Sequence, residues 1–468
     1  MKRYAMKNLL EWKNNPHHKP LILQGARQVG KTWLMKEFGK QYFEKTAYFI
    51  FEKNTLLQDI FKVDLNPDRI LEALSILAGF KITPQTLILF DEIQECPEAI
   101  TALKYFQEQK PEYYIIAAGS LLGVALHKGL SFPVGKVSFL TLYPLSFYEF
   151  LDAMGESIMA EHLEKGDFKL LSAFHDKLMM LLKKYFFIGG MPAVVSDFAI
   201  NQDFQNVRIL QNEILISYQD DFSKHMPKNE LAKVRLLWQS IPSQLAKENK
   251  KFVYGKIQKG SRAKEYENAI AWLEACGLIH KINRISKPDL PLNAYKDVSV
   301  FKLFMVDIGL LSAMSSLDAK TLLDKNEIFE EFKGALTEQY VLQQLVNYSE
   351  KLVLSYWSNE SYTNELDFIV QYNNNVIPVE VKAGTNLQSK SLKFFIEKYH
   401  PKQAIRFSAA TFKENDIITD CPLYAVPVFM NKQNELSEET TQTIKDVESG
   451  IHSKKFTSVQ EMLDSLES

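Results

Sequence analysis

The sequence of 468 residues has only three cysteines, which lie far apart at Cys96, Cys276 and Cys421. Their spacing is neither that of metal ligands nor that of a disulfide framework, so we expect three reduced thiols. A run of about 20 apolar residues is also missing, and the N-terminal segment lacks the apolar core of a signal peptide. These absences predict a cytoplasmic protein that does not act at a membrane.

The sequence also lacks an excess of charge of either sign. It has 55 Lys and Arg residues against 57 Asp and Glu residues, a formal net charge of −2, and 46% hydrophobic residues. This composition is typical of a globular protein and excludes a disordered or strongly basic chain. Any contact with DNA therefore requires a local basic patch. Because the chain is too long for one hydrophobic core, we expect about three domains.

The most specific motif lies near the start, where residues 25–32 follow the pattern G-x-x-x-x-G-K-[ST]. An apolar run precedes it as an expected strand, and an expected helix follows it. The glycines let successive backbone N–H groups point at one anion, and the helix N-terminus adds positive potential. Lys31 would reach the β- and γ-phosphates of ATP, and Thr32 would bind Mg²⁺. The alternative is a strand–helix turn without a ligand. The predicted nucleotide-binding residues are Gly25, Ala26, Arg27, Gln28, Val29, Gly30, Lys31 and Thr32.

Two carboxylates end the next strong strand pattern, at residues 86–92. Asp91 would hold Mg²⁺, and Glu92 would orient or deprotonate the attacking water. The alternative is a buried strand that ends in a solvated Asp-Glu pair. Ser120 follows another apolar run and is a candidate to face the γ-phosphate, although a turn or helix N-cap serine would have the same pattern.

The alternation of strand and helix patterns stops at about residue 125, so we expect a parallel sheet covered on both faces up to that point. Mostly helical sequence follows, and then two or three short helices and a hydrophobic hairpin that resemble a winged helix. A local basic cluster in this region could hold DNA phosphates or be a solvated face. It consists of Lys250, Lys251, Lys256, Lys259, Arg262 and Lys264.

A second chemical signal lies in the last third of the chain, where elements follow in the order α-β-β-β-α-β. Alternation on the third strand puts Glu380 and Lys382 on one face, and a hairpin partner would bring Asp367 beside them. Glu338, on the preceding helix, would complete the acidic set. Asp367 and Glu380 would bind a second Mg²⁺ or Mn²⁺, while Lys382 would position water against a phosphodiester. The alternative is an edge hairpin with exposed charges.

With these motifs the chain resembles bacterial and archaeal AAA-type P-loop ATPases that carry a C-terminal PD-(D/E)XK nuclease-like domain. The resembling parts are residues 25–32, 90–94, 143–151, 189–192 and 306–311, together with Glu338, Asp367, Glu380 and Lys382. The resemblance implies ATP with Mg²⁺ and a winged helix between the motor and the C-terminal domain. Similar proteins often have an arginine where this chain has Lys136. An arginine for the γ-phosphate would therefore be Arg27, Arg262 or a residue of a neighbouring subunit in a homo-oligomer.

The predicted fold class is α/β, with an N-terminal P-loop parallel sheet and helices, a helical and winged-helix middle region, and a C-terminal α/β nuclease-like domain. We expect domains at residues 1–150, 151–230, 231–300 and 301–430, followed by a tail at 431–468. The predicted function is an ATP-hydrolysing switch or motor coupled to a metal-dependent nuclease-like domain that acts on DNA. The alternative is a regulatory or scaffold ATPase whose C-terminal domain only binds a partner. The predicted catalytic residues are Lys31, Glu92, Ser120, Glu338, Asp367, Glu380 and Lys382.

Overall fold

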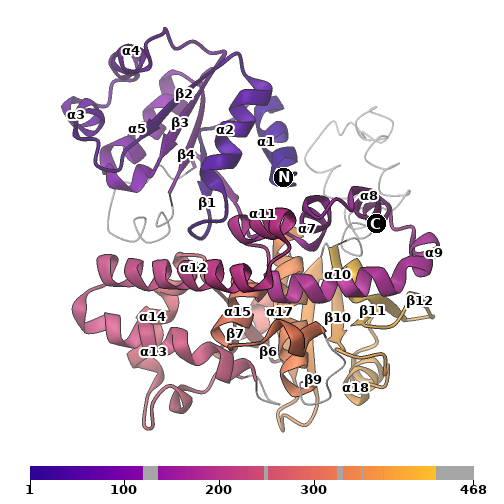
Figure 1. The fold of residues 1–468 in the computed structure, drawn as a ribbon. Helices are drawn as coiled ribbons and strands as arrows, with labels where there is room; N and C mark the ends of the chain where they lie inside the picture. Colours follow the sequence, from indigo (N-terminus) through magenta and orange to yellow (C-terminus); the bar gives the residue numbers. More distant parts are fainter. Residues whose placement is uncertain (120–134, 247–250, 324–329, 349–351, 373, 428–468) are drawn as a thin grey trace, which may run out of the picture.

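The computed structural model describes residues 1–119, 135–246, 251–323, 330–348, 352–372 and 374–427. Two β-sheets organise these residues. The N-terminal sheet stands above a larger body built on the second sheet, and helices α10 and α12 cross the top of that body (Figure 1). The predicted α/β fold class is confirmed.

The N-terminal sheet has five parallel strands in the order β2-β3-β4-β1-β5. Its strands are Leu21–Gln24 (β1), Lys45–Ile50 (β2), Thr86–Asp91 (β3), Tyr114–Ala118 (β4) and Ser138–Thr141 (β5). Its helices are Ala5–Asn14 (α1), Lys31–Tyr42 (α2), Thr55–Val63 (α3), Pro67–Ala78 (α4) and Pro97–Gln109 (α5). Side chains of α1 and α2 pack on one face of the sheet, and those of α3, α4 and α5 pack on the other. Burial on both faces explains why β3 is a continuous apolar run up to Asp91.

Helices form the middle of the chain. They are Phe147–Ala153 (α7), Ser157–Glu164 (α8), Phe168–Leu171 (α9), His175–Ile188 (α10), Pro192–Asn201 (α11), Phe204–His225 (α12), Lys228–Leu245 (α13) and Ala263–Ala275 (α14). The hairpin that was expected after α14 is formed by Ile279–Ile285 (β6) and Lys296–Met305 (β7). Two short helices follow it, Ile308–Met314 (α15) and Ala319–Leu323 (α16).

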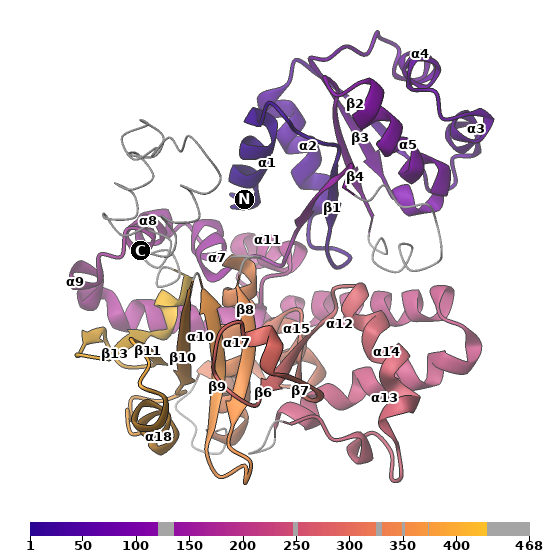
Figure 2. The same ribbon diagram turned by 180° about the vertical axis from the view of Figure 1, so that it is seen from behind.

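The second sheet has eight strands in the order β12-β13-β11-β10-β9-β8-β6-β7 (Figure 2). The expected α-β-β-β-α-β series is present, and two further strands follow it. These elements are Glu330–Tyr348 (α17), Val353–Ser358 (β8), Glu365–Tyr372 (β9), Asn375–Val381 (β10), Lys390–Tyr399 (α18), Ala404–Ser408 (β11), Lys413–Glu414 (β12) and Ile418–Pro422 (β13). Because β6 pairs with β8, in parallel, the β6–β7 hairpin belongs to the same sheet as the C-terminal strands. Among the described helices, none has the length and apolar character needed to cross a bilayer.

A buried ring of hydrogen bonds joins the middle helices to the C-terminal domain. Asp307 Oδ2 accepts from the Gly190 N–H at 2.6 Å, and Gly190 O accepts from the Leu145 N–H at 2.7 Å. Tyr185 donates to Leu145 O at 2.5 Å, and Gln343 Nε2 donates to both Tyr185 and Asp307. A Cβ at position 190 would collide with Leu145 O, so only glycine fits there. Burial raises the pKa of Asp307 to about 6.

Candidate functional site

The phosphate-binding motif forms a tight loop between β1 and α2, as the sequence predicts. Gly25 has a φ of 141°, and a Cβ there would collide with Leu142 O, so the backbone directly after β5 leaves no room for a side chain. Gly30 is the N-cap residue of α2. The loop thus places backbone N–H groups at a helix N-terminus, where an anion is favoured.

Lys31 lies beneath this loop and is only 8% exposed. Its ammonium donates to Gly25 O and Ala26 O, both at 2.8 Å. Burial lowers the pKa of Lys31 to about 8, and the nearby charges of Glu92 and Asp91 oppose that shift. Loop carbonyls therefore hold the ammonium in a buried site that disfavours its charge. A phosphate bound by the loop would stabilise that charge.

Thr32 and Asp91, the two residues predicted to bind the Mg²⁺ of ATP, lie in contact. Thr32 Oγ1 donates to Asp91 Oδ2 at 2.7 Å, and the Tyr48 hydroxyl donates to the same oxygen at 2.8 Å. A hydroxyl beside a carboxylate is a donor set that suits Mg²⁺, so these residues fit ATP with its metal. The sequence analysis missed Tyr48, whose contact with Asp91 depends on the pairing of β2 with β3.

Glu92 follows Asp91 in a left-handed conformation with a φ of 51°. Its Oε2 accepts a hydrogen bond from Gln94 Nε2 at 2.6 Å. A non-glycine residue in this conformation costs about 1–3 kcal/mol, and such residues concentrate at functional sites. Ser120 lies outside the described residues, although β4, the strand before it, lies between β1 and β3.

Helix α12 contacts the loop directly. Arg27 Nη1 lies 2.5 Å from Asp221 Oδ1, and Gln28 Nε2 donates to Ser217 Oγ at 3.0 Å. The Tyr218 hydroxyl donates to Arg27 O at 2.9 Å. Of the other basic residues considered for the γ-phosphate, Lys136 forms an ion pair with Glu108 at 3.0 Å, and Arg262 is exposed at the start of α14.

In the C-terminal domain the β9–β10 hairpin brings the predicted residues to one place. Lys382 Nζ lies 2.8 Å from Glu380 Oε1, which also accepts from Ser389 Oγ at 2.9 Å. Asp367 Oδ2 accepts from the Val381 N–H at 2.7 Å. The expected juxtaposition of Asp367 with the strand of Glu380 is therefore present.

Lys302, on β7, is a site residue that the sequence analysis missed. It is fully buried, with Nζ 2.6 Å from Glu365 Oε1 and 3.8 Å from Glu338 Oε2. Burial alone would lower the pKa of Lys302, but Glu365, Glu338 and Asp367 outweigh it and raise the pKa above the ordinary lysine value. A lone lysine inside the apolar run at residues 300–306 was the available signal.

The acidic set of the C-terminal domain is paired with lysine side chains. Within the described residues, no group of three or more His, Cys, Asp or Glu side chains lies close enough to hold a metal ion. Instead, lysine ammoniums contact three of the carboxylates, those of Glu338, Glu365 and Glu380.

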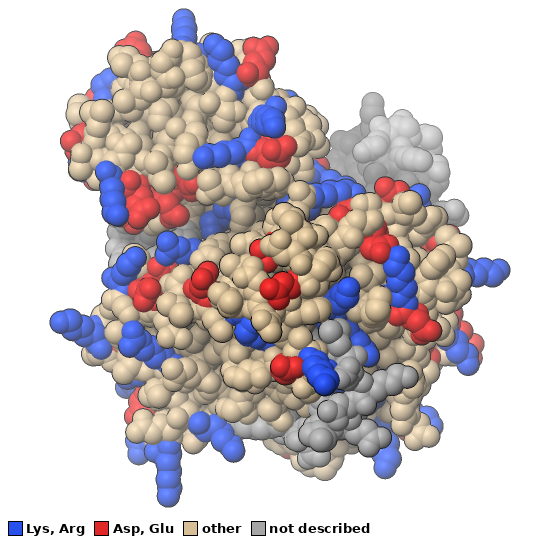
Figure 3. All heavy atoms as spheres, viewed as in Figure 1, with Lys and Arg blue, Asp and Glu red and all other residues tan. Residues whose placement is uncertain are grey.

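The basic cluster near α14 is only partly described, because Lys250 lies outside the described residues. Lys256, Lys259, Arg262 and Lys264 are exposed. On the face shown in Figure 3, basic side chains are interspersed with acidic ones. DNA contact stays a prediction.

Comparison with family models identifies the N-terminal part of the chain. A model described as an AAA domain matches residues 17–151. Two models described as domains of unknown function, DUF8612 and DUF4143, match residues 179–321 and 333–426. No curated protein matches the chain significantly. The AAA-type prediction is therefore confirmed, while the nuclease identity stays a prediction.

Several solved structures are distantly similar. The chain is 15% identical to the Walker-type ATPase PABY2304 of Pyrococcus abyssi, with a TM-score of 0.43, over 67% of this chain and 95% of that one. For the Orc1 protein of Aeropyrum pernix in complex with DNA, the identity is 13% and the TM-score 0.26, over 68% and 93% of the two chains. For Cdc6p of Pyrobaculum aerophilum, the identity is 11% and the TM-score 0.24, over 69% and 96%. The chain carries an AAA-type ATPase domain at residues 17–151, followed by a C-terminal domain whose function is unknown.

Proposed function

We propose that this protein is an ATP-driven switch in which the nucleotide state of the AAA domain sets the state of a C-terminal binding module. One observation carries the proposal: helix α17 contacts both parts. Near its C-terminal end, Gln344 Oε1 accepts from the Phe147 N–H at 2.8 Å, and Asn347 Nδ2 donates to Pro144 O at 2.7 Å. At the middle of the same helix, Glu338 faces Lys302 in the acidic site.

The segment that contacts α17, which contains Pro144 and Phe147, is connected to the proposed ATP site through the N-terminal sheet. It follows β5, which pairs with β1, the strand that leads into the phosphate-binding loop. A shift of the loop and β1 would therefore displace the segment around Phe147 and, through it, α17. Since packed elements have discrete arrangements, such a shift is suited to a two-state switch.

For hydrolysis, the contacts of Lys31, Thr32, Asp91 and Glu92 support the roles predicted for them. Bound ATP would bring Mg²⁺, which neutralises charge on the phosphates. Thr32 and Asp91 would hold the metal, and Lys31 would exchange its two carbonyl partners for phosphate oxygens. Glu92 would orient the attacking water, with Gln94 fixing its carboxylate.

Two features of the acidic site favour a binding role over cleavage. Lys302 supplies internally a positive charge that a nuclease would obtain from a metal ion, and Lys382 is paired with Glu380. Buried carboxylates that are already paired with ammoniums have less need of a cation.

Cleavage remains a second candidate function because of Glu380. Its Oε2 is buried and has no hydrogen-bond partner among the described residues. An unpaired carboxylate oxygen beside Asp367 and Lys382 would suit a single Mg²⁺ or Mn²⁺ ion with substrate oxygens as further ligands.

Hydrogen exchange combined with ATP hydrolysis tests the switch. We expect hydrolysis to be lost in Lys31→Ala and Glu92→Gln, and retained in Lys40→Ala, which changes an exposed lysine of the same helix. In Glu92→Gln, ATP should change amide exchange in α17 relative to ADP. Identical exchange in the two nucleotide states would contradict the switch.

A nuclease assay decides between the two candidate roles. Purified protein would be incubated with DNA and Mg²⁺ or Mn²⁺, with and without ATP. Cutting that is lost in Lys382→Ala but kept in Lys390→Ala, an exposed lysine of α18, would favour cleavage. Absence of cutting while ATP is hydrolysed favours the binding module.

A further inference from the structure

Arg3 is a buried arginine outside the ATP-binding motifs, and all its nitrogens have partners in the ATPase domain. It is 6% exposed. Its Nε donates to Glu149 Oε1 at 3.0 Å, its Nη1 to Val29 O at 2.9 Å and its Nη2 to Tyr143 O at 2.6 Å. These acceptors come from two segments of the chain, the phosphate-binding loop and residues 143–149, so the planar guanidinium fixes the two segments relative to one another.

Val29 belongs to the phosphate-binding loop and directly precedes Gly30. In a planar trans peptide the C=O and the following N–H point in opposite directions. Arg3 holds the Val29 C=O from one side, so the Gly30 N–H points away from Arg3. The donors of this loop are the groups that hold the phosphates, and Arg3 thus sets the direction of one of them.

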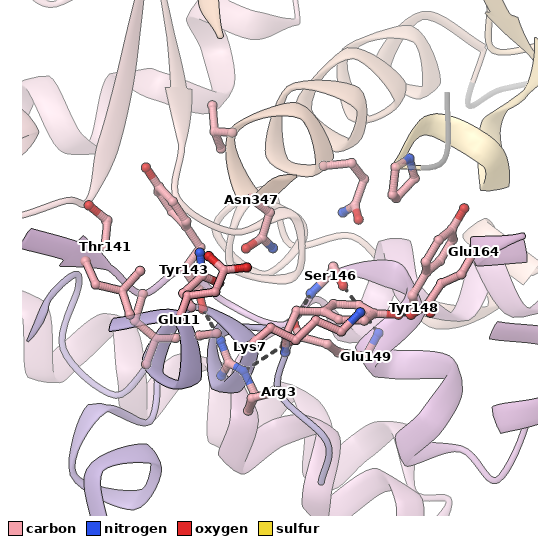
Figure 4. A pocket seen from close by; sticks show the side chains of 18 residues that line it. Arg3, Lys7, Glu11, Thr141, Tyr143, Ser146, Tyr148, Glu149, Glu164 and Asn347 are labelled. Atoms are coloured by element: carbon pink, nitrogen blue, oxygen red, sulfur yellow. Dashed lines mark hydrogen bonds and ion pairs between the residues drawn. The ribbon is translucent and has the colours of Figure 1, made fainter. Parts of the chain in front are cut away.

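Glu149 keeps Arg3 in place. This carboxylate is 3% exposed, and its Oε1 also accepts from the Tyr4 N–H at 2.7 Å. Its Oε2 accepts from the Ser146 N–H at 2.8 Å, as part of the capping box of α7. Arg3, Ser146 and Glu149 lie together in the wall of a cavity of about 650 Å³ between α1 and the end of α17 (Figure 4). Because several N–H donors hold this carboxylate in one position, it also holds the guanidinium of Arg3 in one position.

We propose that Arg3 is a positioning residue of the ATPase: it holds the Val29–Gly30 peptide in the orientation that binds phosphate, and Glu149 holds Arg3. The assignment rests on the ATP binding proposed above. Lysine cannot replace Arg3, because an ammonium lacks the fork that reaches three acceptors in one plane.

Steady-state hydrolysis in Arg3→Lys and Arg3→Ala tests the assignment, with Lys2→Ala as the control for charge at the adjacent, exposed position. A loop N–H that contacts phosphate in both ground and transition states contributes uniform binding. We therefore expect KM for ATP to rise by about tenfold in Arg3→Lys while kcat changes by less than about threefold. Glu149→Gln should raise KM by a smaller factor, and Lys2→Ala should leave it unchanged.

The melting temperature without nucleotide is measured beside the kinetics, because Arg3→Ala removes a buried charge and could unfold the protein. An unchanged KM in both Arg3→Lys and Arg3→Ala would overturn the assignment. If the melting temperature falls while KM stays unchanged, Arg3 has only a packing role, and the assignment is overturned as well. If the native protein binds no ATP, the proposed function fails and the assignment fails with it. If the native protein binds ATP and the variants bind it equally well, only the assignment fails.

Discussion

At the scale of single residues, we expect ATP binding to depend on the charge of Lys31. Burial lowers the pKa of its ammonium to about 8 in the free protein. Above that pH the free protein has a neutral Lys31, whereas phosphate oxygens would favour the charged form, so binding must take up a proton. We expect ATP affinity to fall by up to about tenfold for each pH unit above about 8.

Calorimetric titration with ATP across this pH range, in buffers of different ionisation enthalpy, measures both the affinity and the proton uptake. Lys31→Arg is the informative variant, because a guanidinium stays charged and should give an affinity that is independent of pH. A native protein whose affinity stays constant as the pH rises through 8 and beyond would contradict the prediction.

The second residue-scale prediction concerns Lys302. Its fully buried ammonium lies 2.6 Å from Glu365 and 3.8 Å from Glu338. Lys302→Met keeps the shape of the side chain but leaves buried carboxylate charge without its cation. We expect the free energy of unfolding to fall by about 3–5 kcal/mol.

Urea denaturation checks this value, with Lys296→Met as a control at the exposed start of the same strand. Adding Glu365→Gln to Lys302→Met removes one of the unpaired charges and should recover part of the loss. A loss no larger than that of Lys296→Met would show that Lys302 does not stabilise the acidic site.

At the scale of elements, the buried ring of hydrogen bonds around Asp307 joins α10, α15, α17 and the segment between β5 and α7. Burial raises the pKa of Asp307 to about 6 from its ordinary value of 3.8, so the folded state binds this proton more tightly than the unfolded state. The free energy of unfolding should therefore fall as the pH rises from about 4 to about 6, and this contribution stays constant above that range. For one group the fall amounts to about 3 kcal/mol.

Other groups titrate over the same range, so Asp307→Asn supplies the comparison. The free energy of unfolding of the native protein minus that of this variant should fall by about 3 kcal/mol between about pH 4 and about pH 6. Urea denaturation at several pH values measures it. A difference that is independent of pH would show that Asp307 does not hold its proton in the fold.

Elements whose signals lie within a short stretch were predictable from the sequence. The strands around the phosphate-binding loop and the series from α17 to β11 follow from local periodicity and turn residues. Strand order was not predictable in this way. The position of β4 between β1 and β3, and the pairing of β6 with β8, join residues that are far apart in the chain.

The same distinction applies to the site residues. The proximity of Lys31, Thr32 and Asp91 could be predicted because the motif spacing places the loop and the acidic end of β3 at one edge of the sheet. Arg3 and Lys302 could not, because their partners come from segments that only the fold brings together. The sequence shows that such residues are present but not which acceptors they reach.

At the scale of the whole molecule, the proposed switch depends on α17 as the link between the two bodies. Gln344 accepts from the Phe147 N–H at 2.8 Å and donates to the Tyr185 hydroxyl at 3.3 Å. Gln344→Leu removes both bonds and keeps much of the side chain's volume. The Phe147 N–H then has no acceptor, which costs about 1–3 kcal/mol and loosens the contact between the AAA domain and α17.

We expect Gln344→Leu to hydrolyse ATP at close to the native rate, because it changes no group at the phosphate-binding loop, while ATP no longer alters amide exchange in β9 and β10. Exchange mass spectrometry with ATP and with ADP measures this loss of coupling, and Gln388→Leu, at an exposed position before α18, is the control. If Gln344→Leu keeps the native response of β9 and β10 to ATP, the link does not pass through this contact. A variant that loses both hydrolysis and the response would instead show that the contact supports the ATPase domain itself. Loss of the response with hydrolysis retained is expected only if α17 lies downstream of the ATP site.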